Sequence, residues 1–251
     1  MTPSAPVVPA RTWVPSLRRV LFTLSLLLLV VWFFPPLTGW TRRYEFVQAI
    51  EWSVFGFWVP VLFVSGAPWR VDAPSARWWR SRRRVSQRRA LGAAAAFIAV
   101  SLFWRLTPVV NALTQHPALA VVEALSLGAA GIVLFMDLVE SPPFRPGISR
   151  PYRIGVSAAV MWSSWVFAYL EAMSHTSWYR AFRHVAGRSL SVSADQQLSA
   201  GSVWFITGTV FVPIIFWNLV YWLQSEEDPD AELYQLVREE RDRGFFGYRP
   251  D

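Results

Sequence analysis

Four ionisable side chains interrupt otherwise apolar stretches of this chain: Glu51, Arg105, Glu123 and Glu171. Ionisable groups within hydrocarbon are costly unless they face a bundle interior, a cavity or one another, so these four are the first candidates for chemistry. If Glu51 and Glu123 face the interior, both carboxylates can reach the guanidinium of Arg105, whose planar fork can pair with two acids. Three interpretations stay open: a structural charge cluster, a proton or ion path, and a ligand site.

Metal-binding and catalytic patterns are sparse. Copper favours histidine, methionine and cysteine, but the chain has no cysteine and only three histidines. Met173 and His175 are the best-placed pair of donors, and His116 and His184 are isolated. We expect no bound metal or cofactor, with copper as the open alternative. The chain contains no zinc-protease pair, nucleophile elbow or phosphate-binding glycine loop, so we expect no enzymatic activity.

Transmembrane helices must position these residues. The chain holds six mostly apolar stretches of about 17 to 24 residues, each near the length that crosses a hydrocarbon core. The sequence therefore predicts an all-α polytopic transmembrane bundle of about six spans. The predicted spans are residues 20–37, 44–64, 90–106, 118–138, 154–173 and 200–223.

Arginine-rich segments indicate the orientation, because such loops stay on the cytoplasmic side. The loop 70–89 is rich in arginine. Six alternating spans then place the N-terminal segment 1–19 and the acidic tail 224–251 in the cytoplasm as well. The same topology places the four charged residues near the outer surface of the membrane. Next to membrane helices, an arginine run indicates topology and contact with anionic lipid, so we expect no nucleic-acid partner.

The start of the last predicted span carries a polar motif. Asp195, Gln196 and Gln197 precede the apolar run, where a carboxylate is favoured by the exposed backbone N–H groups of a helix start. We therefore expect these residues to cap the final helix. Gly201 and Trp204 follow at helical spacing within the stretch A-D-Q-Q-L-S-A-G-S-V-W-F, residues 194–205.

That stretch and two others together resemble a known family. Residues 103–126 read F-W-R-L-T-P-V-V-N-A-L-T-Q-H-P-A-L-A-V-V-E-A-L-S, and residues 59–68 read V-P-V-L-F-V-S-G-A-P. In order, spacing and placement at helix ends, the three resemble the cytochrome c oxidase assembly factor CtaG family over roughly residues 44–235. Members are bacterial membrane proteins associated with assembly of the copper site in terminal oxidases.

The resemblance also implies where this chain departs from its relatives. Family members usually carry histidines four residues apart where this chain has Gln48 and Trp52, and again where it has Ala120 and Ala124. Another histidine is replaced by Arg105. Two imidazoles at i and i+4 on one helix would suit a metal. Because this chain lacks these histidines, we expect it to keep the helical scaffold without the metal ligands. Trp52 would fill space beside the alanines, and Arg105 would supply a fixed positive charge.

The resemblance implies a non-catalytic assembly or accessory component of a respiratory oxidase, spanning the bacterial plasma membrane several times. Its expected partners are membrane lipid and either oxidase subunits or another membrane complex. Two alternatives stay open. One is a copper chaperone that uses Met173 and His175, and the other is a small ion or solute transporter that uses Glu51, Arg105 and Glu123.

Overall fold

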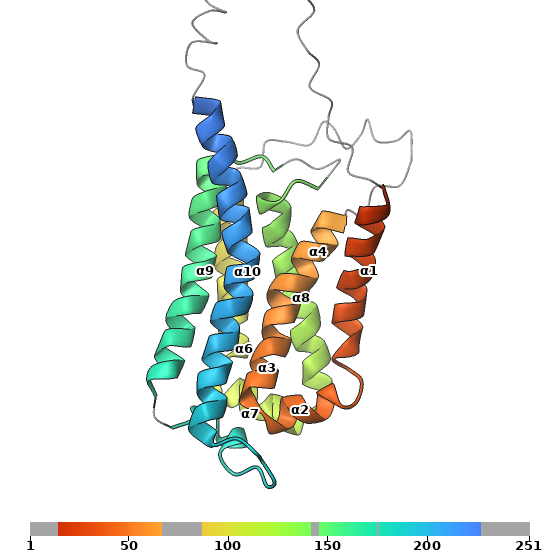
Figure 1. The fold of residues 1–251 in the computed structure, drawn as a ribbon, viewed down its shortest axis with the longest axis vertical. Helices are drawn as coiled ribbons and strands as arrows, with labels where there is room; N and C mark the ends of the chain where they lie inside the picture. The colour runs from red at the N-terminus through yellow and green to blue at the C-terminus, as the bar shows by residue number, and fades with distance from the viewer. Residues whose placement is uncertain (1–14, 67–86, 142–145, 175, 227–251) are drawn as a thin grey trace, which may run out of the picture.

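The computed structural model describes residues 15–66, 87–141, 146–174 and 176–226, and this part of the chain folds as a helical bundle (Figure 1). Most of the arginine-rich loop 70–89 and of the tail 224–251 lies outside it. The longer elements are α1 (Pro15–Val31), α3 (Glu45–Ser53), α4 (Val59–Gly66), α6 (Gln87–Trp104), α8 (Ala118–Leu138), α9 (Arg150–Met173) and α10 (Val192–Glu226). The short ones are α2 (Leu37–Arg43), α7 (Thr107–Gln115), the π-helical η1 (Val54–Trp58) and the 3-10 helix η2 (Arg180–Phe182).

The described residues contain four helical segments that are long and apolar enough to cross a membrane, or five if the bent pair α6 and α7 forms one span. The four are Glu45–Gly66, Ala118–Leu138, Arg150–Met173 and Val192–Gln224. An all-α membrane bundle is thus confirmed, whereas the count of six spans stays a prediction.

The first predicted span, residues 20–37, is wrong in its bounds. Helix α1 ends at Val31, and Leu37 already belongs to α2. The chain turns between them at Pro35 and Pro36, which are joined by a cis peptide bond, because proline lacks the N–H that would continue the helix. With 17 residues, α1 is about 26 Å long at 1.5 Å per residue, slightly short of a hydrocarbon core of about 30 Å.

Two further boundaries differ from the prediction in ways that affect the site. Helix α6 ends at Trp104, so Arg105 lies outside it, in a break where the α6 and α7 axes differ by 61°. Helix α10 begins at Val192, well before the predicted start at residue 200, because the polar residues ahead of the apolar run are already helical. By contrast, α8 spans residues 118–138 as predicted.

The second membrane segment is continuous but irregular. The π-helical turn η1 joins α3 to α4 and ends two residues before Pro60, whose missing N–H cannot bond the carbonyl of Gly56. Gly131 of α8 packs at this point: a Cβ there would lie 2.5 Å from the Pro60 ring and 2.8 Å from the Gly56 oxygen. Glycine at residue 131 therefore allows α8 to approach the irregular turn closely.

The bundle has an apolar core and two distinct ends. Phe57 contacts Phe97 and Phe211 at ring separations of 5.5 and 5.7 Å, and Phe135 stacks on Phe211 at 5.6 Å. The start of α1 and the end of α10 lie at one end of the bundle, and α2, α7 and the loop between α9 and α10 lie at the other (Figure 1). This second end is the one for which the arginine pattern predicts an outward position, and it carries the candidate site.

Candidate functional site

Arg105 lies at the centre of a buried polar cluster. It is 1% exposed, because the break between α6 and α7 directs its side chain into the bundle. Its guanidinium donates to Glu171 Oε1 at 2.7 Å, to Gln48 Oε1 at 2.8 Å and to Ser199 Oγ at 3.2 Å. Arg105 therefore joins α3, α9 and α10, and its ion-pair partner is Glu171 rather than the predicted Glu51 or Glu123.

Aromatic rings surround the same guanidinium. The ring centroids of Trp52, Phe167 and Tyr179 lie 5.7, 5.6 and 5.2 Å from its central carbon, within the range of cation–π attraction. The Tyr179 hydroxyl also donates to the backbone carbonyl of Arg105 at 3.1 Å. Burial raises the pKa of Tyr179 well above its ordinary value, so this phenol stays neutral and remains a donor. The charge of Arg105 is thus fixed in place from several sides.

Glu45 is a further member of the cluster that the sequence analysis missed. It is fully buried in the first turn of α3 and accepts a 2.7 Å hydrogen bond from the Ser177 hydroxyl. It also interacts electrostatically with Glu171 and Arg105. Glu45 lies at the edge of a predicted span, where a charge is common, so nothing in the local sequence distinguished it from an exposed residue.

Asp195 caps a different helix from the one predicted. Since α10 begins at Val192, Asp195 lies inside its first turn. Its two carboxylate oxygens accept the backbone N–H groups of Glu45 and Phe46, at 2.9 and 3.1 Å, so Asp195 caps the start of α3. It also forms an ion pair with Arg188 of the loop.

The rest of the polar motif on α10 divides between a buried and an exposed face. The Gln196 side chain donates to the backbone carbonyls of Glu171 and Ser174 at the end of α9. Gln197, Gly201 and Trp204 are exposed, and the indole of Trp204 stacks on that of Trp165 at 4.8 Å. Asp195 and Gln196 of this motif therefore link α10 to α3 and α9 by hydrogen bonds.

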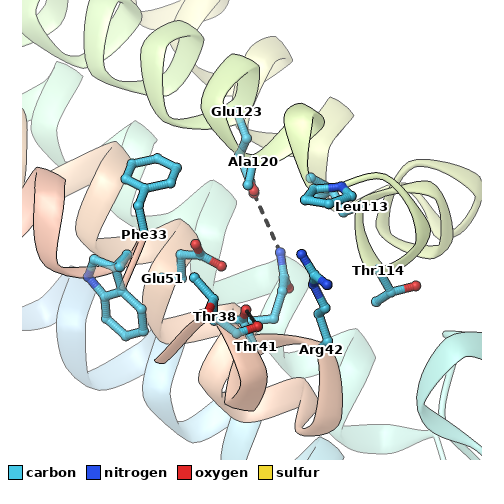
Figure 2. Close-up of a pocket in the computed structure, with 12 residues that line it drawn as sticks. Phe33, Thr38, Thr41, Arg42, Glu51, Leu113, Thr114, Ala120 and Glu123 are labelled. Atoms are coloured by element: carbon cyan, nitrogen blue, oxygen red, sulfur yellow. Dashed lines mark hydrogen bonds between the residues drawn. The ribbon is translucent and has the colours of Figure 1, made fainter. Parts of the chain in front are cut away.

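A cavity with both polar and apolar walls adjoins the Arg105 cluster on the side of α2, α7 and α8. The Gln48 amide donates to Glu123 Oε1 at 3.4 Å while its oxygen accepts from Arg105, so Gln48 separates the cluster from the cavity. Figure 2 shows Glu51 and Glu123 on opposite walls. The cavity has a volume of about 260 Å³ and is lined by Trp32, Phe33, Thr38, Thr41, Arg42, Gln48, Glu51, Leu113, Thr114, Pro117, Ala120 and Glu123.

Trp52 and Ala124 lie in the helix interface beside this cavity and do not line it. Both are 2% exposed, and the Trp52 indole donates to the Ser101 carbonyl at 3.2 Å. Ala120 does line the cavity. The expected filling of this region by Trp52 is therefore incomplete, because open space remains next to Ala120.

Donors suited to copper do not gather at this site. The described residues contain no group of three or more histidine, cysteine, aspartate or glutamate side chains that could hold a metal ion. Met173 is 60% exposed, His116 and His184 are exposed, and His175 lies outside the described residues. The groups that face the cavity offer oxygen and amide donors, which do not match the soft and imidazole ligands that copper prefers.

Comparison with known proteins agrees with the resemblance noted from the sequence. The model of a family described as cytochrome c oxidase caa3 assembly factor matches residues 5–225. No curated protein and no solved structure matches the chain. The family match includes every helix of the bundle up to the last turn of α10. This chain, with its buried arginine cluster, therefore belongs to the cytochrome c oxidase caa3 assembly factor family.

Proposed function

We propose that this protein serves a cytochrome c oxidase of the bacterial plasma membrane as a non-catalytic assembly or accessory component. The family match supports the oxidase association, and the apolar helices support a membrane location. We further propose that it acts without a copper ion at the positions of Gln48, Trp52, Ala120 and Ala124.

The single observation that carries the second proposal is the placement of Arg105. Its buried guanidinium contacts Gln48 and packs near Trp52, so a permanent positive charge lies beside two of the positions where relatives are expected to have histidine. A copper cation at that point would be repelled by the Arg105 guanidinium. Moving Arg105 away would break the hydrogen bonds that hold it. The side chains of Ala120 and Ala124 offer no donor atom, and the Trp52 indole N–H is already bonded to Ser101.

A deletion strain tests this proposal. Removal of the gene should lower the amount of haem-bearing cytochrome c oxidase in the membrane, and a plasmid copy should restore it. Added copper should not restore the oxidase, because the protein is proposed to support assembly without delivering the metal. Unchanged oxidase in the deletion strain would refute the oxidase association, and rescue by copper would refute the copper-free role.

The copper-chaperone alternative depends on Met173 and His175 and can be separated in the same strain. If the pair delivers copper, a Met173→Ala/His175→Ala double variant should lose oxidase copper while the protein level stays unchanged. On our proposal the double variant supports normal oxidase, because the proposed role does not depend on copper delivery by these two side chains.

A further inference from the structure

We propose that the cavity between α2, α3, α7 and α8 binds a small organic cation that carries an ammonium group on an apolar body. The first observation is Glu51, which is 5% exposed and points into the cavity (Figure 2). No donor among the described residues forms a hydrogen bond to its carboxylate. A carboxylate that is largely removed from solvent and has no donor on the protein is costly, and the ammonium group of a ligand in the cavity would supply that donor.

The charges around the cavity match a single positive charge. Glu51 and Glu123 contribute two carboxylates, and Arg42 contributes one guanidinium that acts on Glu51 electrostatically. With both carboxyl groups ionised, the formal charges sum to one negative charge, which a monovalent ammonium group balances. A divalent metal ion would leave an excess of positive charge, and the described residues offer no third acidic or imidazole ligand to hold one.

The remaining walls suit an apolar body. Trp32, Phe33, Leu113 and Ala120 line the cavity together with the carboxylates, and pockets for small molecules typically combine apolar walls with a few oriented polar groups. Aromatic faces also attract ammonium groups. The indole N–H of Trp32 is buried without a partner among the described residues. A volume of about 260 Å³ exceeds the space that a bare ion needs.

The cavity reaches the surface at the end of the bundle that carries α2 and α7. Two of its lining residues, Arg42 and Pro117, are exposed. By the predicted orientation this end faces outward, so a ligand would enter from outside the cell. The inference does not depend on the association with an oxidase, because binding is a property of the purified protein.

Calorimetric titration of the detergent-purified full chain with benzylamine tests the proposal. Benzyl alcohol is the matched probe without charge. Glu51→Gln removes the cavity carboxylate, Glu140→Gln removes an exposed carboxylate at the other end of the bundle, and Ala120→Phe fills the cavity. We expect saturable benzylamine binding that weakens at least about tenfold in Glu51→Gln, consistent with loss of a charge-assisted hydrogen bond.

The other arms have equally definite expectations. Glu140→Gln should bind benzylamine as the unmodified chain does, and Ala120→Phe should lose binding while its thermal unfolding stays cooperative. Equal binding of benzyl alcohol and benzylamine would overturn the proposal, because the site would then recognise only apolar bulk. Undiminished binding by Glu51→Gln, absence of benzylamine binding, or competition by magnesium chloride alone would overturn it as well.

Discussion

Replacing Glu171 by glutamine should strongly destabilise this protein, because Glu171 is the buried partner of Arg105. The side chains of both residues are fully buried, and the pair is 2.7 Å apart. Removing one partner of such a pair leaves an uncompensated buried charge and typically costs about 3–5 kcal/mol of unfolding free energy. Gln48 and Ser199 still contact the guanidinium in Glu171→Gln, so we expect a loss near the lower end, about 3 kcal/mol.

Glu140 provides a matched control within the same chain. It also pairs with an arginine, Arg153, but at 3.9 Å and with its own side chain 68% exposed. Exposed pairs contribute only about 0–1 kcal/mol, so Glu140→Gln should unfold almost as the unmodified protein does. The same chemical change at two sites thus separates the effect of burial from that of lost charge.

Reversible unfolding in mixed micelles, with increasing SDS and with tryptophan fluorescence as the signal, measures both variants. The single variant Arg105→Gln and the double variant Arg105→Gln/Glu171→Gln complete a double-mutant cycle. The double variant should lose less unfolding free energy than Arg105→Gln and Glu171→Gln together, because no unpaired charge remains. If Glu171→Gln loses no more than Glu140→Gln, the cluster is not a structural centre and the reasoning fails.

Three further predictions concern packing, capping and pH. Gly131→Ala should lose about 1–3 kcal/mol of unfolding free energy by overpacking against Pro60. Gly128→Ala on the same helix should not destabilise the protein, because no atom lies within 4 Å of its added Cβ. Equal SDS midpoints for the two variants would contradict this. Asp195→Ala should cost about 2 kcal/mol, because the start of α3 loses its cap, and hydrogen exchange should rise there first; unchanged exchange at Glu45 would argue against the cap. Burial raises the pKa of Tyr179, so the contribution of the neutral phenol to stability is complete below the unfolded pKa of about 10 and is lost as pH rises above it. Tyr179→Phe should therefore be less stable than the unmodified protein at pH 7 and should lose less unfolding free energy between pH 9 and 11. Parallel pH profiles of the two proteins would count against this interpretation.

Membrane helices could be predicted from the sequence where one physical signal dominates. The mostly apolar run of residues 118–138 predicted the bounds of α8 correctly, because its length and mean hydropathy indicate a membrane helix despite the two acidic residues within it. The adjacent prolines at residues 35 and 36 were also visible, but their consequence was not anticipated. They end the first helix early and set α2 across the end of the bundle.

The pairing of the charged residues could not be read from one chain. Arg105, Glu123 and Glu171 stand out as charges in apolar runs, yet which carboxylate meets the guanidinium depends on helix order and on the 61° break. Asp195 shows the same limit. Its position before an apolar run predicts a cap for its own helix. The backbone N–H groups that it caps lie about 150 residues away in the sequence, and only tertiary packing brings them to it.

Affinity purification from the protein's own host membranes tests the oxidase association most directly. A tagged copy with a photoreactive residue in place of the exposed Trp204 would be irradiated before mild solubilisation, so that transient contacts are also captured. We predict that cytochrome c oxidase subunits are crosslinked and enriched, with haem near one-to-one if the protein is a permanent subunit. Oxidase subunits no more abundant than in a purification of an unrelated tagged membrane protein would contradict the account.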